Sequence, residues 1–74
     1  MLSFYRWLQI QGARADPVGD LARDARQDAA WPKRTNALPR LDRYLRDRGA
    51  GVLARRALRR AYGEWVLATA DELE

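Results

Sequence analysis

Three interruptions divide the chain into four segments, and each segment has the apolar spacing of a helix. The interruptions lie at Gly12, at the Trp31-Pro32 pair and at residues 49–51, where two glycines flank an alanine. Glycine readily ends a helix, and proline restricts the residue before it to extended backbone. No segment shows the strict alternation of apolar and polar residues that indicates a strand. The sequence therefore predicts an all-α chain.

Local signals place the first two helices. Ser3 is a suitable N-cap for the first helix, and Gly12 is expected to close it in a left-handed conformation. Asp16 is a suitable N-cap for the second helix, because Pro17 then takes the first helical position, where a missing N–H costs nothing. The apolar stripe of this second helix predicts that it continues to about Ala29.

The third helix is expected from about Leu38 to Arg48, with Gly49 as its stop. The fourth is expected from about Val52 to Ala68. Four helices joined by short turns favour one compact orthogonal bundle.

A chain of 74 residues has room for one domain with a small core. We place this domain at residues 1–70 and expect residues 71–74 to be a frayed acidic tail. The chain has no cysteine and no histidine, so neither a disulfide nor a thiol–imidazole zinc site is available to stabilise it. Packed side chains must provide the stability. Five are expected to meet in the core: Trp7, Leu21, Leu41, Leu58 and Trp65.

Catalysis has no support in the residue types present. Apart from tyrosine, the hydroxyl residues are Ser3, Thr35 and Thr69, and no histidine is available to activate them. A glycine-rich phosphate loop is also missing, and the aspartates of the second helix lie along it instead of converging on a point. We therefore expect no enzyme activity, no cofactor, no metal site and no small-molecule substrate.

Several short motifs, taken in order, resemble one known family. They are Ser3-Phe4-Tyr5 with Trp7-Leu8, Leu21-Ala22, Asp28, Trp31-Pro32-Lys33, Tyr44-Leu45 and the closing Ala61-Tyr62-Gly63-Glu64-Trp65. In this order and spacing they resemble the YozE SAM-like family over nearly the whole chain. The resemblance implies a small bacterial protein with a four-helix fold like the sterile alpha motif (SAM). It implies no activity, cofactor or catalytic residue.

Positive charge is concentrated in the middle of the chain. Between Lys33 and Arg60, ten basic residues face only Asp42 and Asp47, a balance of +8, whereas the whole chain carries +4. On the fourth helix, arginines occupy the arc nearly opposite the apolar stripe, a departure from the family pattern. Like charges at this spacing repel, and a merely solvated face is better served by mixed signs.

This charge pattern predicts an anionic partner, with nucleic acid ahead of other polyanions. The third helix adds arginines on the side away from its apolar stripe, and the sequence does not decide whether the two ridges merge or face opposite directions. The predicted nucleic-acid-binding residues are Lys33, Arg34, Arg40, Arg43, Arg55, Arg56, Arg59 and Arg60.

Aspartates recur every four residues on the second helix, from Asp16 through Asp20 and Asp24 to Asp28. One interpretation pairs them with arginines of their own and neighbouring helices. The other is an acidic face that binds a protein partner or, head to tail, the basic face of a second copy. For that alternative function the predicted residues are Asp20, Asp24 and Asp28.

Trp31 is expected to fold inward over the core rather than to form an exposed recognition loop. Contact between the fourth helix and a membrane surface would require the same apolar stripe that the core buries, so a membrane partner is disfavoured. The absence of cysteine and of any long apolar stretch is typical of a cytoplasmic protein, which is the location we expect.

Overall fold

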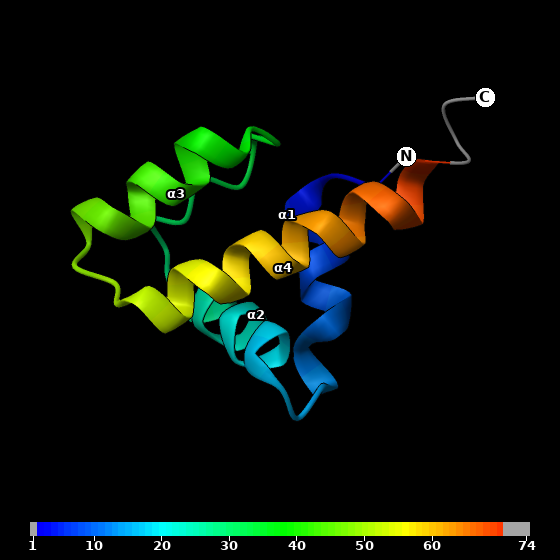
Figure 1. Cartoon of the computed structure of the whole chain (residues 1–74), viewed down its shortest axis with the longest axis horizontal. Coiled ribbons are helices and arrows are strands. Elements are labelled where there is room, and N and C mark those ends of the chain that lie inside the picture. Colours follow the sequence, from blue (N-terminus) through cyan, green and yellow to red (C-terminus); the bar gives the residue numbers. More distant parts are fainter. Residues whose placement is uncertain (1, 71–74) are drawn as a thin grey trace.

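The computed structural model describes residues 2–70, and within them it contains four α-helices and no strand. The expected all-α class is confirmed; the predicted tail at 71–74 lies outside the described residues. The helices are α1 (Phe4–Ile10), α2 (Pro17–Gln27), α3 (Leu38–Asp47) and α4 (Val52–Thr69), with a 3₁₀ turn at Gln11–Ala13 (Figure 1).

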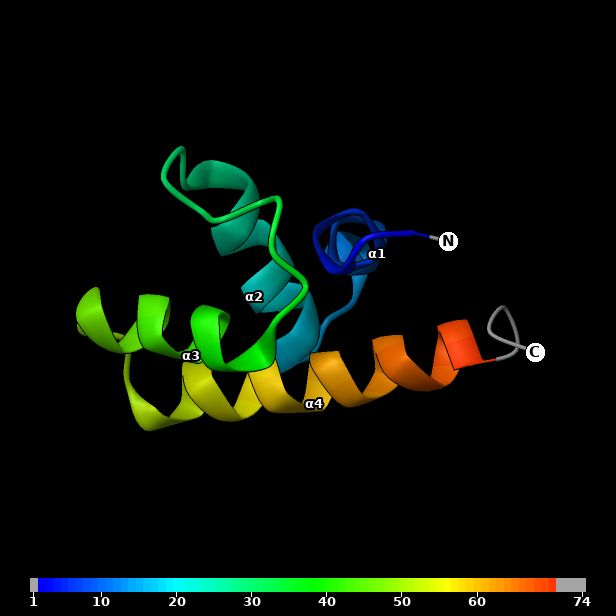
Figure 2. The ribbon, with the colours of Figure 1, turned by 90° about the horizontal axis from the view of Figure 1, so that it is seen from above.

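The longest helix, α4, crosses the molecule and packs against each of the other three (Figure 1). Its first half lies beside α3, which runs in the opposite direction, and α2 crosses beneath it. Figure 2 shows α4 lying across the view while α1 is seen nearly end-on, beside the second half of α4. The predicted orthogonal bundle is therefore confirmed.

Both predicted N-caps are present. The hydroxyl of Ser3 accepts a hydrogen bond from the backbone N–H of Arg6 at 3.2 Å. The carboxylate of Asp16 accepts one from Gly19 N–H at 2.9 Å, and Pro17 follows at the first helical position. Each cap satisfies one of the N–H groups that the first helical turn leaves without a partner.

Gly49 ends α3, as predicted. It has a φ of 75°, which is the left-handed region, and its N–H donates to the carbonyl of Arg46 at 3.0 Å. The N–H of Ala50 donates to the carbonyl of Leu45 at 2.9 Å. These two bonds form a Schellman motif, which turns the chain sharply and so brings α4 back alongside α3.

The prediction of a left-handed Gly12 is wrong. Gly49 is the only glycine with positive φ among residues 2–70. Gly12 instead lies in the 3₁₀ turn Gln11–Ala13, which ends when Arg14 N–H donates to the carbonyl of Gln11 at 3.0 Å. Tightening the last helical turn satisfies these backbone groups without a left-handed residue.

The expected continuation of α2 to Ala29 is also wrong. The helix ends at Gln27, and Asp28 is extended, with a φ of −95° and a ψ of 103°. The carboxylate of Asp28 accepts hydrogen bonds from the backbone N–H of Ala30 at 3.0 Å and from the hydroxyl of Tyr44. A side chain that bonds the backbone two residues ahead favours a turn over further helix.

The five predicted core residues are all buried and belong to one cluster. Phe4 lies at its centre, fully buried, with the rings of Tyr62 and Trp65 at centroid distances of 5.5 and 5.8 Å. Trp31 is buried as well, with its ring edge-on to Tyr44. Its indole N–H has no hydrogen-bond partner in the described part of the chain. The expectation that Trp31 folds inward is thus met.

Gly19 marks the closest approach between α2 and the turn that precedes it. A Cβ atom at this position would overlap the carbonyl oxygen of Arg14. The start of α2 can therefore lie directly on that turn only because residue 19 has no side chain.

Candidate functional site

The arginines of α4 lie on two flanks of the helix. On the flank toward α3, Arg55 forms a bidentate pair with Asp42, with both N–O distances at 3.0 Å. The hydrogen bond from Arg55 lowers the pKa of Asp42 below its usual value, and Arg55 is itself only 25% exposed. Arg59 approaches the same carboxylate at 3.7 Å. This pair joins α3 to α4, so the main role of Arg55 is structural.

On the other flank, Arg60 lies near Glu64 at 3.2 Å and Asp16 at 3.7 Å. Arg14, from the turn before α2, reaches both acids at 2.7 Å. The hydrogen bond from Arg14 lowers the pKa of Glu64, and the two acids in turn raise the pKa of Arg14. These four side chains connect the start of α2 to α4 and keep Arg60 close to acidic neighbours.

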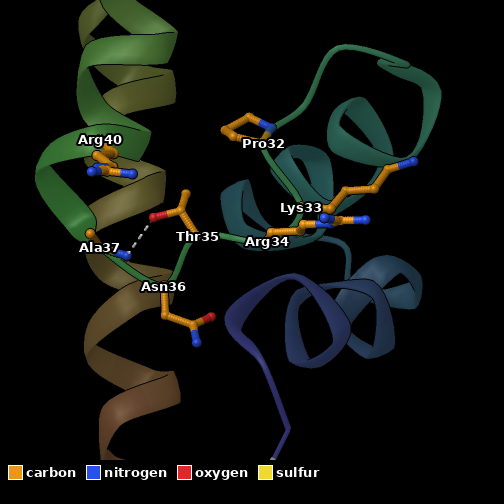
Figure 3. Close-up of a pocket in the computed structure, with 7 residues that line it drawn as sticks. All are labelled: Pro32, Lys33, Arg34, Thr35, Asn36, Ala37 and Arg40. Atoms are coloured by element: carbon orange, nitrogen blue, oxygen red, sulfur yellow. Dashed lines mark hydrogen bonds between the residues drawn. The ribbon is translucent and has the colours of Figure 1, made fainter.

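Three other predicted cations line an open hollow of about 790 Å³ between α3 and the segment that precedes it (Figure 3). They are Lys33 and Arg34 from the segment and Arg40 from the first turns of α3. No carboxylate lines the hollow, and none of the three cations has an ion-pair partner within residues 2–70. These side chains are exposed and keep their charge available to solvent.

The segment that carries Lys33 and Arg34 is fixed at its end. The side-chain oxygen of Asn36 accepts a hydrogen bond from Phe4 N–H at 2.9 Å, and its backbone carbonyl accepts one from the hydroxyl of Tyr62 at 2.6 Å. Bonds to α1 and α4 therefore hold the segment in place. With the backbone fixed and Trp31 buried, the following two cationic side chains are left on the surface.

The cations around the hollow do not converge on one point. Figure 3 shows Lys33 and Arg34 extending to one side of their segment, whereas Arg40 stands on α3 at the other side. The ammonium of Lys33 lies 5.6 Å from the ring centroid of Tyr5, a cation–π contact that fixes its direction. Such an arrangement suits an extended anion better than a single small one.

A family profile described as YozE SAM-like fold matches residues 3–66. The chain belongs to the YozE SAM-like family. The matched residues include all four helices up to the last turn of α4, and the whole of the hollow. No curated protein and no solved structure gives a significant match.

Arg43 and Arg56 complete the predicted cations of this YozE SAM-like domain. Both are exposed, and in the described part of the chain neither has an ion-pair partner. Arg43 lies three residues beyond Arg40 on α3, so the two are neighbours on the helix surface, but Arg43 does not line the hollow itself. Arg56 lies on α4, on the flank toward α2. The structure thus places three of the eight predicted cations at the hollow and Arg43 beside it on α3, whereas the α4 arginines lie elsewhere.

The predicted acidic ridge is shorter than expected in the domain. Asp28 lies beyond the end of α2, where the hydroxyl of Tyr44 donates to it and lowers its pKa, and where Arg48 approaches at 3.5 Å. It joins α2 to α3 rather than extending the exposed face of α2. Asp20, which is paired with Arg23, and Asp24 remain exposed on α2.

Sequence reasoning missed two groups of surface residues. Thr35 and Asn36 line the hollow. The sequence signal that could have identified them is their position between two cations and the helix start at Leu38-Pro39. Val52 and Leu53 are 63% and 77% exposed, and both fall outside the apolar arc of their helix.

No helix among the described residues is both long enough and apolar enough to cross a membrane. In the same part of the chain, no three acidic side chains gather closely enough to hold a metal ion.

Proposed function

We propose that this YozE SAM-like domain is a non-catalytic module that binds nucleic acid by contacting its phosphates. The contacts are made by Lys33, Arg34, Arg40 and Arg43. The observation that carries the proposal is the open hollow, because three cations without ion-pair partners in residues 2–70 line it and no carboxylate does. Unpaired cations on one surface attract a polyanion, whereas cations already paired with acids are largely neutralised.

The same reasoning assigns a smaller role to the paired arginines of α4, which are Arg55, Arg59 and Arg60. Withdrawing Arg55 from Asp42 would leave a half-buried carboxylate without its partner. Arg59 and Arg60 are each more than half exposed but share acids with neighbours, so they add general attraction rather than a defined contact. Since phosphate contacts carry no sequence information, we expect little base specificity.

Fluorescence anisotropy with labelled DNA and RNA at several salt concentrations tests this function. If about four phosphates are neutralised, the logarithm of the affinity falls against the logarithm of salt concentration with a slope of about −3 to −4. The dissociation constant is expected to be about micromolar or weaker at physiological salt and to depend little on sequence. Absence of binding at low salt would refute the function.

Two double variants with the same loss of charge locate the contact surface. Arg34→Gln with Arg40→Gln is expected to weaken binding to every sequence and to flatten the salt slope by about two. The matched control, Arg59→Gln with Arg60→Gln, removes two exposed cations of α4 that already have acidic partners, and is expected to change the slope by less than half as much. If the control has the larger effect, the contact surface lies on α4 instead.

A further inference from the structure

A second surface, separate from the hollow, lies between α2 and the first half of α4. It is a groove of about 490 Å³. Its apolar lining includes Leu21, Ala57 and Leu53, and the last of these is 77% exposed. Exposing a leucine to water beside an apolar groove is unfavourable. A partner that covers both would bury this apolar area and so stabilise the complex.

The two rims of the groove carry opposite charge. Asp20 and Asp24 lie on the α2 rim, and Arg56 and Arg60 lie on the α4 rim. Each pair is four residues apart, so the two charges on each rim have the same spacing. Within residues 2–70, Asp24 and Arg56 have no ion-pair partner, although they line the same groove.

The order of the charges along the groove also agrees. Arg60 lies beside the start of α2, where it approaches Asp16 at 3.7 Å. Arg56, one turn earlier on α4, is therefore displaced toward the end of the groove where Asp24 lies. A two-fold axis along the groove would exchange the rims, and would place the acidic rim of each copy opposite the basic rim of the other.

We infer that the groove binds a second copy of this chain, in a reciprocal dimer. In this dimer Asp24 of each copy faces Arg56 of the other, and Asp20 faces Arg60. Leu53 of each copy covers the groove of its partner. The occupant is a second copy because one surface supplies both halves of the charge pattern at the same spacing, which is what an isologous interface requires.

Sedimentation equilibrium on the full chain, freed of nucleic acid, measures this association. We expect a monomer–dimer equilibrium in the micromolar-to-millimolar range at low salt, since the groove is small. Added salt is expected to weaken it, because the pairs at the rims are exposed. The mass is expected to stop at two copies; growth beyond two would indicate a head-to-tail chain and overturn the reciprocal dimer.

Charge exchange supplies the sharpest test. Asp24→Arg and Arg56→Asp each place like charges opposite one another twice in the dimer, so each variant alone is expected to dimerise at least about tenfold more weakly. Mixed in equal amounts, the two variants restore both attractive pairs and are expected to form a 1:1 heterodimer. Both residues are exposed, and circular dichroism checks that the fold is retained.

Two equally exposed leucines test whether association depends on the groove or on exposed apolar residues in general. Leu53→Ser is expected to weaken the dimer at least about tenfold, because it removes the apolar contact at the groove. Leu67→Ser is the matched control, since Leu67 is also 77% exposed but lies near the other end of α4. Equal effects of the two variants would contradict the groove as the interface.

A chain that stays monomeric up to about 1 mM in low salt, or two variants that form no heterodimer on mixing, would overturn the dimer even if the groove binds another protein. The nucleic-acid contact is tested on Arg34 and Arg40, which line the hollow and not the groove, so the two proposals can fail separately. Arg34→Gln with Arg40→Gln is expected to leave the dimer unchanged.

Discussion

The two halves of α4 contribute to the domain in different ways. Residues 61–69 carry Tyr62 and Trp65, whose rings pack against Phe4 from α1, and the indole N–H of Trp65 donates to the carbonyl of Leu2 at 3.0 Å. Residues 52–60 carry the arginines and contact α3 through the partly buried pair of Arg55 with Asp42, which Arg59 also approaches. The comparison teaches that buried aromatic rings anchor the second half of the helix, whereas the first half buries only Ala57 and Leu58 and keeps most of its arginines exposed to partners.

The largest effect is expected from truncating the aromatic half. Trp65→Ala removes a buried ring from the centre of the core and is expected to cost about 3–5 kcal/mol. The total stability of a domain this small is of similar size, about 5 kcal/mol, so the variant is expected to be largely unfolded at room temperature. Thermal melting followed by circular dichroism measures this. A folded variant with a nearly native melting temperature would contradict the view that the aromatic half of α4 stabilises the fold.

The dependence of stability on acidic pH tests the contacts of the carboxylates as a group. Asp16, Asp28 and Asp42 have pKa values below their usual 3.8, and Glu64 has one below its usual 4.5, because each accepts hydrogen bonds in the folded chain. The unfolded chain therefore takes up protons first as the pH falls. The stabilisation is complete above these usual values and is lost as the pH falls through them toward the folded pKa values.

Thermal melts between pH 2 and pH 7 follow this loss. The melting temperature is expected to be level above about pH 5, since the chain has no histidine to titrate near neutrality, and to fall below about pH 4. A melting temperature that stays level down to about pH 2 would show that the contacts of these four carboxylates contribute no stability.

A smaller effect is expected from one charged contact alone. Asp42→Asn leaves Arg55 without its carboxylate partner and is expected to lower the melting temperature by about 3–5 °C. Asp47→Asn is the matched control on the same helix, because Asp47 is exposed and has no ion-pair partner within residues 2–70. Equal melting of the two variants would show that the α3–α4 contact rests on apolar packing only.

The predictions from sequence that the structure confirms are of features that depend on neighbouring residues. Asp16 caps α2 through Gly19, three residues later, and Gly49 closes α3 through carbonyls within the same turn. The burial of Trp65 followed from helical spacing, which the backbone geometry fixes. Local chemistry of this kind is independent of how the helices finally pack.

Several partners of charged side chains were not predictable, because they come from distant parts of the chain. Arg14 meets Glu64 fifty positions later, and Asp42 meets Arg55 thirteen positions later. The same is true of Asp28, whose partner Tyr44 lies sixteen positions away. A helical projection shows which arginines share a face, but only the packed structure shows which of them are already paired.

The contact between Gly19 and the turn before α2 limits which substitutions this sequence can accept during evolution. Any side chain at position 19 would push against the backbone of Arg14, and Arg14 cannot move freely because it bonds Asp16 and Glu64 at once. Replacing this glycine therefore requires either a different conformation of the turn or the loss of the contacts from Arg14 to Asp16 and Glu64. A residue other than glycine at position 19 is therefore expected only in relatives in which Arg14 has also changed or in which α2 enters the bundle by another path.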